Sequence, residues 1–415
     1  MKTEIPPLAK WTVTLLLLGC AAALAFNRDF YNSSLVSAYF ALTLASTLML
    51  QMRVRPAMPD VAYVLLGTSL IAAVDFGWLR FPVQILAPFS FLGLSSLTVL
   101  GIRTVWADAK DRRLLLCALV PALLFTLSDW MASTLLALTE KLHPQTLDLY
   151  LYSFDASLHV QLSFLLGRAF HRWEWLRAIS LIFYIGLALP VLMVYAGQLG
   201  RKKEKALPLM FAFLVTGPLG ILFYNLFPAV GPAHIFSAGF PLHPLTTAQA
   251  ATLFLEPWTI QGARNCMPSL HMAWVLLAWW NSKGLSWIAR SIALAFVIFT
   301  ILATLGTGEH YFIDLVVAFP FALMIQALCV STLPWQTGLR RRSFLLGAAT
   351  TLGWLALLRY GKAIFWSSPV VPWTLIVLTV GVMVWLRRRL EQERGDGSPA
   401  GEALPQDEVT LAAFR

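Results

Sequence analysis

The feature that most constrains the fold is a series of long apolar runs separated by short polar segments. Most of the runs have roughly the 17–25 residues that an α-helix needs to cross the hydrocarbon core of a bilayer. The sequence therefore predicts an all-α, polytopic transmembrane helical bundle. We place about twelve spans, near residues 11–26, 35–52, 61–78, 82–102, 114–138, 176–199, 207–230, 270–281, 285–305, 311–333, 343–360 and 371–386.

Two alternatives bear on this count. The first run follows Lys2 and Lys10 and contains "AAALAF", a pattern that also fits a cleaved signal peptide. We favour an uncleaved first span because many more spans follow. The two neighbouring runs within 61–102 also fit a single hairpin, which would change the number of spans.

The charge of the chain supports a membrane location and argues against nucleic-acid binding. Of the 415 residues, 58% are hydrophobic and 13% charged, about half the charged share of a soluble domain. The net charge of +10 comes from short basic blocks in alternate loops, which is the pattern of the positive-inside rule. This alternation predicts that both termini are cytoplasmic and that residues 139–174, 231–269 and 306–310 face outward. We infer no nucleic-acid partner.

The four cysteines, Cys20, Cys117, Cys266 and Cys329, indicate neither a disulfide framework nor a zinc site. Three of them lie inside apolar runs, and no C-x-x-C spacing occurs. Cys266 lies in a motif described below, and we interpret it as a packing residue rather than a nucleophile.

The histidines indicate an outward-facing site. All seven lie in or beside the three outward segments, whereas the cytoplasmic loops, which are also polar, carry none. Histidine also collects at membrane interfaces simply because it is polar, so this bias alone does not define a site. Within the first outward segment, polar residues interrupt the apolar stretch at 147–172, so it is not a clean span and we expect an amphipathic helix along the outer interface.

Two motifs carry the candidate chemistry: "RNCMPSLH" at 264–271 and "GTGEHYFIDL" at 306–315. His310 follows His271 by 39 positions (310 − 271), and a predicted helical hairpin lies between them. A hairpin returns its two outer ends to the same membrane face. The topology can therefore place both imidazoles in one pocket.

Spacing suggests how the second motif works. His310 and Asp314 are four residues apart, which places them on one helix face. A carboxylate there can fix the imidazole tautomer and leave the other nitrogen as a base or nucleophile. A second histidine, His271, can then protonate a leaving group. The simpler alternative is a structural His–Asp pair, but a carboxylate entering a bilayer is costly enough to favour a functional role.

The first motif suggests phosphate binding. Pro268 suits a first helical turn, and Ser269 can cap the helix, whose free N–H groups bind phosphate readily. Arg264 can supply a guanidinium to phosphate oxygens. The alternatives are a plain helix cap for Ser269 and an interface anchor for Arg264.

The pair "PSLH" and "EHYFIDL" resembles the type 2 phosphatidic acid phosphatase superfamily, most closely its inositol phosphorylceramide synthase-like branch. The resemblance covers roughly residues 207–333 and implies a six-helix catalytic core. It also implies that His310 attacks phosphorus to form a phosphohistidine, that Asp314 orients His310, that His271 acts as general acid and base, and that Ser269 binds phosphate. No metal and no cofactor are implied.

The sequence departs from the family pattern at three points. The first family motif, a lysine followed by Arg-Pro, is not recognisable. The Ser-Arg of the third motif falls on Ala303 and Thr304, which leaves Arg264 as a replacement phosphate ligand. Leu270 stands where P-S-G-H has glycine, which matches the synthase-like branch.

These features predict an organisation and a function. We expect N-terminal transmembrane helices at 1–138, a catalytic core with an outer interfacial segment at 139–335, C-terminal transmembrane helices at 336–389 and a disordered cytoplasmic tail at 390–415. The expected function is a metal-independent lipid phosphatase or phosphotransferase of the plasma or inner membrane, facing outward. Its partners would be membrane lipids, a phospholipid or polyprenyl phosphate substrate and, for transfer, an alcohol acceptor.

Two other functions fit the sequence. A multi-span lipid or solute transporter without phosphotransfer chemistry fits the number of spans, although no paired broken helices mark a midplane site. A metal-dependent hydrolase that uses His271, His310 and Asp314 as ligands fits the same residues.

Overall fold

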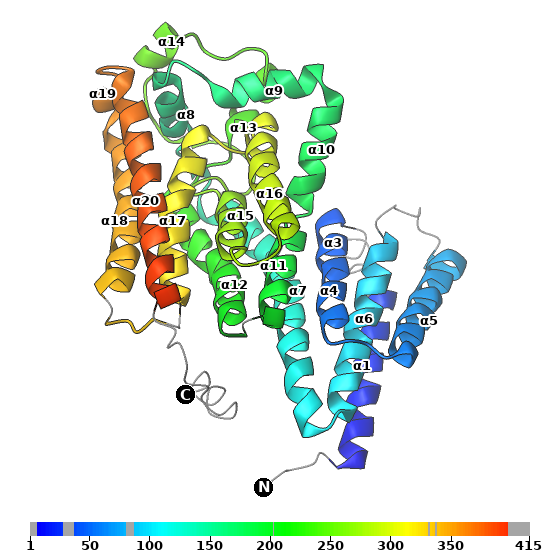
Figure 1. Cartoon of the computed structure of the whole chain (residues 1–415). Coiled ribbons are helices and arrows are strands. Elements are labelled where there is room, and N and C mark those ends of the chain that lie inside the picture. Colours follow the sequence, from blue (N-terminus) through cyan, green and yellow to red (C-terminus); the bar gives the residue numbers. More distant parts are fainter. Residues whose placement is uncertain are drawn as a thin grey trace.

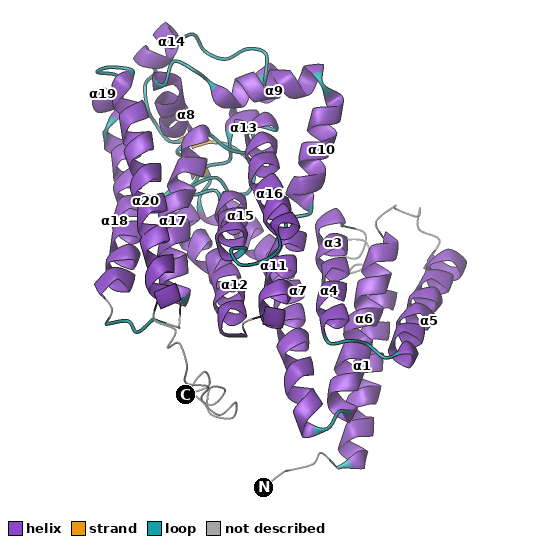
Figure 2. Cartoon of the chain, viewed as in Figure 1, coloured by secondary structure: helices purple, strands orange, loops and turns teal. Residues whose placement is uncertain are grey.

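The computed structural model describes residues 6–27, 37–79, 87–201, 203–330, 333–336 and 338–396. Within them the chain is almost entirely helical, which confirms the predicted all-α class. The strands that it contains are the two-residue β1 (Gln145–Thr146) and β2 (Trp258–Thr259), which pair antiparallel. Figure 2 shows this small ladder between helices.

An N-terminal group of helices lies to one side of the rest of the molecule (Figure 1). Its members pack mainly around α6, and α7 runs between this group and the remaining helices. The group and its connecting helix are α1 (Pro7–Phe26), α3 (Ala38–Ser46), α4 (Leu48–Arg53), α5 (Met58–Val74), the π-helical turn η2 (Asp75–Leu79), α6 (Ala87–Trp106) and α7 (Ala109–Leu142).

The larger bundle forms around α17 (Phe312–Cys329). This helix is apolar and buried along most of its length, as expected of a helix that neighbours surround on all sides. It packs against α12 (Lys203–Leu226), α15 (Leu270–Asn281), α18 (Gly338–Tyr360) and α20 (Val370–Asp396). Its N-terminus therefore lies inside the molecule, where it can carry a buried site.

The remaining elements surround this centre. The pair α10 and α11 bends by 50° at its junction and packs on α16 and α15, and the short elements close one end of the bundle (Figure 1). The remaining elements, long and short, are α8 (Asp148–Ser157), α9 (Leu162–Arg172), α10 (Glu174–Ile185), α11 (Ala188–Arg201), α13 (Pro232–Phe236), η3 (Ser237–Gly239), α14 (Thr247–Thr252), α16 (Trp287–Gly306) and α19 (Lys362–Phe365).

The predicted apolar segments are helical where the structure describes them, but the count of twelve spans is not confirmed. Among the residues that the structure describes, seven helices are long and apolar enough to cross a membrane, or eight if the bent pair α10–α11 is one span. The predicted segment 35–52 is divided between α3 and α4, and α15 has 12 residues. These long apolar helices indicate an integral membrane protein.

Two predicted boundaries differ from the structure. All ten residues of α8 are buried, so the first half of the 147–172 segment is core rather than an interfacial helix. Within this segment, α9 is the helix with apolar residues on one face and polar residues on the other, and it lies across the end of the bundle (Figure 1). The helix α20 continues to Asp396, beyond the expected start of a disordered tail at 390, and residues 397–415 lie outside the described residues.

Candidate active site

The two sequence motifs meet at the N-termini of α15 and α17. The helices α15 and α16 form the predicted hairpin, and five residues, 307–311, separate the end of α16 from the start of α17. The backbone N–H of Ser269 donates to the Asp314 carbonyl over 3.2 Å, which ties the first motif to the second. Residues 264–271 and 306–315 therefore form one compact region.

His310 is held on both nitrogens. Its Nδ1 lies 3.3 Å from Asp314 Oδ2, and its Nε2 lies 3.2 Å from Ser269 Oγ. The backbone is fixed as well, because the His310 N–H donates to the Thr304 carbonyl and the His310 carbonyl accepts from Ser163 Oγ. All three side chains of the Asp–His–Ser row are buried, so the imidazole has one defined orientation.

Asp314 receives two further hydrogen bonds on the oxygen that faces His310. The Tyr311 N–H and the Cys266 thiol each donate to Oδ2 over 2.8 Å. Among the described residues, Asp314 Oδ1 has no hydrogen-bond partner. These bonds hold the carboxylate in the rotamer that points at His310.

Sequence reasoning interpreted Cys266 as packing and missed its contact with Asp314. Burial, followed by the negative charge of Asp314, raises the pKa of the Cys266 thiol well above its usual range. The thiol is therefore protonated at neutral pH and acts as a hydrogen-bond donor rather than a nucleophile. Only its place within the motif at 264–271 could have pointed to this role.

His271 lies in the first turn of α15 and, unlike His310, is partly exposed. Its ring stacks on Tyr184 of α10 at 4.1 Å between centroids and 22° between planes, and it meets Trp274 edge-on. Ser269, two residues before His271, contacts His310 Nε2 through its Oγ over 3.2 Å. The structure thus brings together His271 and His310, as the hairpin topology predicted, and adds Tyr184, which no sequence motif indicated.

Two aspartates of α8 hold the backbone around the site. The Asp155 carboxylate accepts from the N–H groups of Phe312 and Ile313 over 2.6 and 3.2 Å and so caps α17. The Asp148 carboxylate accepts from the N–H groups of Val230 and Gly231. The sequence suggested interfacial positions for both aspartates, whereas both are buried and structural.

Arg264 lies in a different environment from the two histidines. It is fully buried, and its guanidinium donates to the backbone carbonyls of His143, Pro144, Ile260 and Gly262. These bonds fasten residues 260–264 to the β1 region. A phosphate-binding role for Arg264 remains a prediction, and it would require some of these bonds to be exchanged.

Three side chains of the site also form a set that could hold a metal. One ligand atom from each of Cys266, His310 and Asp314 lies within 4.8 Å of the others. The set combines sulfur, nitrogen and oxygen donors, which zinc accepts. However, the thiol is a hydrogen-bond donor to the carboxylate, and its raised pKa opposes the thiolate that a metal requires.

Fold and site together define a helical membrane protein with a buried, carboxylate-oriented histidine beside a second histidine. A comparison with protein families supports this description, because residues 149–328 match the family model of the PAP2 superfamily. The matched stretch runs from α8 to α17 and contains both motifs. It indicates a phosphatase-type membrane protein and a phosphatase or phosphotransferase activity. No curated protein and no solved structure matches the chain.

Proposed function

We propose that the protein is an integral membrane lipid phosphatase or phosphotransferase that works through a phosphohistidine on His310. The observation that carries the proposal is the row Asp314–His310–Ser269, with contacts of 3.3 and 3.2 Å. A carboxylate at Nδ1 holds the neutral ring in the tautomer whose Nε2 bears a lone pair. The match to the PAP2 superfamily over residues 149–328 supports the same chemistry.

The reaction proceeds in two steps, formation of the phosphohistidine and transfer of its phosphoryl group. First, the Nε2 lone pair of His310 attacks phosphorus, the bond from phosphorus to the lipid oxygen breaks, and His271 gives that oxygen a proton. Next, His271 takes a proton from water or an alcohol, whose oxygen attacks phosphorus and breaks the P–N bond. Asp314 stabilises the imidazolium charge that develops during each step, and Ser269 together with backbone N–H groups at the α15 N-terminus binds phosphate oxygens.

The substrate that fits is a phospholipid or a polyprenyl phosphate or diphosphate at the extracytoplasmic face. His271 stacks on Tyr184 at the partly exposed side of the site, where a substrate oxygen can reach it. The "PSLH" form of the first motif favours transfer to an alcohol, as in inositolphosphotransferases, over hydrolysis. Chemistry of this kind uses no metal.

The experiment that tests the proposal compares wild type with His310→Ala in detergent. Both proteins are incubated with phospholipids and polyprenyl diphosphates bearing labelled phosphate, with chelator present. Wild type should release phosphate or form a new phospholipid and carry an acid-labile phosphoryl group, and His310→Ala should do neither. The control, His171→Ala, changes an exposed histidine of α9 and should behave as wild type. Full activity in His310→Ala would remove the mechanism.

A metal-dependent hydrolase is the second candidate because Cys266, His310 and Asp314 lie within ligand distance of one another. Its test is separate from the first. Wild-type protein is dialysed against chelator, and metal content and activity are measured before and after addition of zinc. Activity that disappears with the metal and returns with it would favour this candidate over the phosphohistidine.

A further inference from the structure

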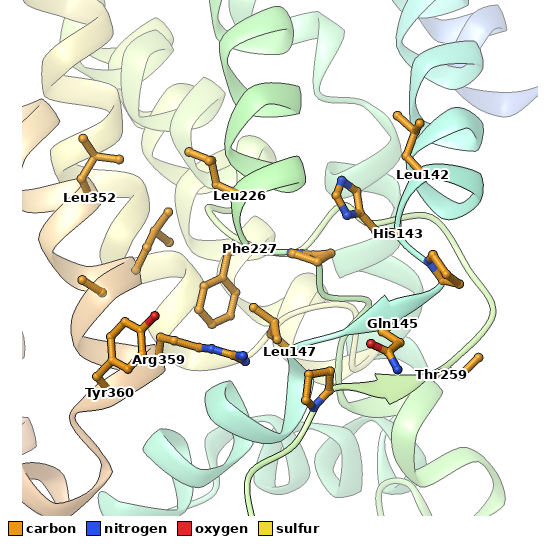
Figure 3. A pocket seen from close by; sticks show the side chains of 15 residues that line it. Leu142, His143, Gln145, Leu147, Leu226, Phe227, Thr259, Leu352, Arg359 and Tyr360 are labelled. Carbon is orange, nitrogen blue, oxygen red and sulfur yellow. The ribbon is translucent and has the colours of Figure 1, made fainter.

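One cavity of the molecule lies away from the candidate active site. It has a volume of about 740 Å³ and lies between the ends of α7, α12 and α18 and the β1–β2 ladder. None of its lining residues belongs to the Asp314–His310–Ser269 row. Figure 3 shows the side chains that surround it, with Arg359 reaching from the end of α18 toward Leu147.

One charged group, Arg359, dominates the chemistry of this cavity. Its guanidinium lies 4.4 Å from the ring centroid of Tyr150. None of the described lining residues is acidic. An anion that enters the cavity therefore meets a guanidinium with no lining carboxylate to compete for its charge-assisted hydrogen bonds.

Most of the other lining residues are apolar, and the cavity opens to the outside of the bundle. Leu142, Leu226 and Leu352 line the cavity and are 58%, 61% and 49% exposed. They belong to α7, α12 and α18, whose apolar surfaces would face lipid in an integral membrane protein. His143 and Gln145 add polar groups on the opposite side, and His143 is fixed by a 2.8 Å contact with Asn225.

We infer that this cavity binds the phosphate group of an anionic phospholipid, with Arg359 as its cation and the exposed leucines against the acyl chains. A free phosphate ion would use only the polar part of this wall, whereas a lipid uses both parts. The inference does not depend on the proposed function, because it concerns binding at a place separate from His310.

The cavity is also joined to the candidate active site. The carbonyls of His143 and Pro144, two lining residues, accept from the Arg264 guanidinium over 2.8 and 3.0 Å. Arg264 begins the motif that ends at His271. A bound lipid would therefore contact the segment that positions the loop before α15.

The experiment measures lipid binding by titration in native mass spectrometry. Every protein is the full chain with His310→Ala, so that bound lipid is not turned over. The ligands are phosphatidylglycerol, diacylglycerol with the same chains, and soluble glycerol 3-phosphate. Two variants alter the cavity: Arg359→Gln removes the cation, and Ala356→Trp fills space at a lining position without removing charge. The control is Arg172→Gln, which alters an exposed arginine that also lies over an aromatic ring, Trp173.

We expect phosphatidylglycerol to bind about tenfold more weakly to Arg359→Gln, the change that follows loss of one charge-assisted contact. Ala356→Trp should weaken binding as well, Arg172→Gln should leave it unchanged, and diacylglycerol should bind weakly to every protein. Equal affinity in the background protein and both cavity variants would overturn the inference. Glycerol 3-phosphate that binds as tightly as phosphatidylglycerol would overturn the assignment to a lipid.

Discussion

At the scale of single residues, the candidate site depends on how one carboxylate is surrounded. Asp314 Oδ2 faces His310 and also receives the Tyr311 N–H and the Cys266 thiol. A carboxylate with several fixed donors has little rotational freedom, so its partner imidazole is also fixed. The thiol is therefore a positioning group that acts on His310 through Asp314.

This role of Cys266 leads to a prediction. Cys266→Ala should lower kcat about tenfold because Asp314 loses a donor, and Cys266→Ser, which keeps a donor, should recover most of the loss. Because Cys266 is buried and the pKa of its thiol is raised, N-ethylmaleimide should leave it unmodified in the folded wild type and modify it after the protein is unfolded. Peptide mass spectrometry measures the labelling, and rapid labelling of Cys266 would contradict the assignment.

At the scale of elements, the site depends on a close approach between the loop before α13 and the loop before α17. Gly231 has φ +101° and ψ 161°, a region that is essentially restricted to glycine. A Cβ added there would lie 2.5 Å from the Glu309 carbonyl oxygen. The neighbour of His310 can therefore occupy its position only if residue 231 has no side chain.

We predict that Gly231→Ala lowers the free energy of unfolding by about 1–3 kcal/mol, the cost of such a backbone conformation, and also lowers activity. Thermal unfolding in detergent, followed by circular dichroism, measures the first effect. The control is Gly381→Ala in α20, where an added Cβ meets nothing within 4 Å. That variant should be as stable as wild type or slightly more stable, since alanine favours a helix interior. Equal melting temperatures for the two variants would contradict the packing argument.

The cap of α17 predicts how stability depends on pH. Burial raises the pKa of Asp155 to about 8, against the opposing effect of the Phe312 and Ile313 N–H groups, with the charge of Asp314 raising it further. The folded state therefore binds this proton more tightly than the unfolded state, whose aspartate has a pKa near 4. Stability contributed by the proton is present at low pH and is lost as pH rises toward and through 8.

We accordingly expect the melting temperature of wild type to fall between pH 6.5 and 8.5, and to fall less in Asp155→Asn, which keeps an acceptor oxygen without a charge. This window lies above the pKa of Asp148, which burial raises to about 6, so that aspartate contributes little there. A pH dependence of the same size in Asp155→Asn and wild type would assign the effect to another group.

At the scale of the whole molecule, the basic loops predict an orientation for the bundle. In that orientation α14 and the candidate site face outward, and the start of α18 is cytoplasmic. A Cys20→Ala background removes the exposed native thiol. In it, a membrane-impermeant maleimide should label Thr247→Cys in intact cells and Arg341→Cys only after permeabilisation, since both positions are exposed. The reverse result would place the site at the cytoplasmic face.

The sequence by itself determined the helical membrane architecture and the pairing of His310 with Asp314 in the candidate site. Apolar run length follows from bilayer thickness, and the four-residue spacing of His310 and Asp314 follows from the helical period, so both are local properties that a linear pattern records. The hairpin between His271 and His310 is nearly as local, because each end of a helix pair returns to the same face. The number of spans could not be predicted as well, because the length of an apolar run does not show where a helix is interrupted or ends early. The break between α3 and α4 and the 12-residue length of α15 are examples.

Only the tertiary structure decided which residues support the site. Cys266 meets Asp314 across 48 positions, and Asp155 caps α17 across 157 positions from the N–H of Phe312. The guanidinium of Arg264 is surrounded by carbonyls of segments as far as 121 positions away. Contacts between distant segments depend on how helices pack and on which buried polar groups need partners, and neither property has a fixed spacing in the sequence.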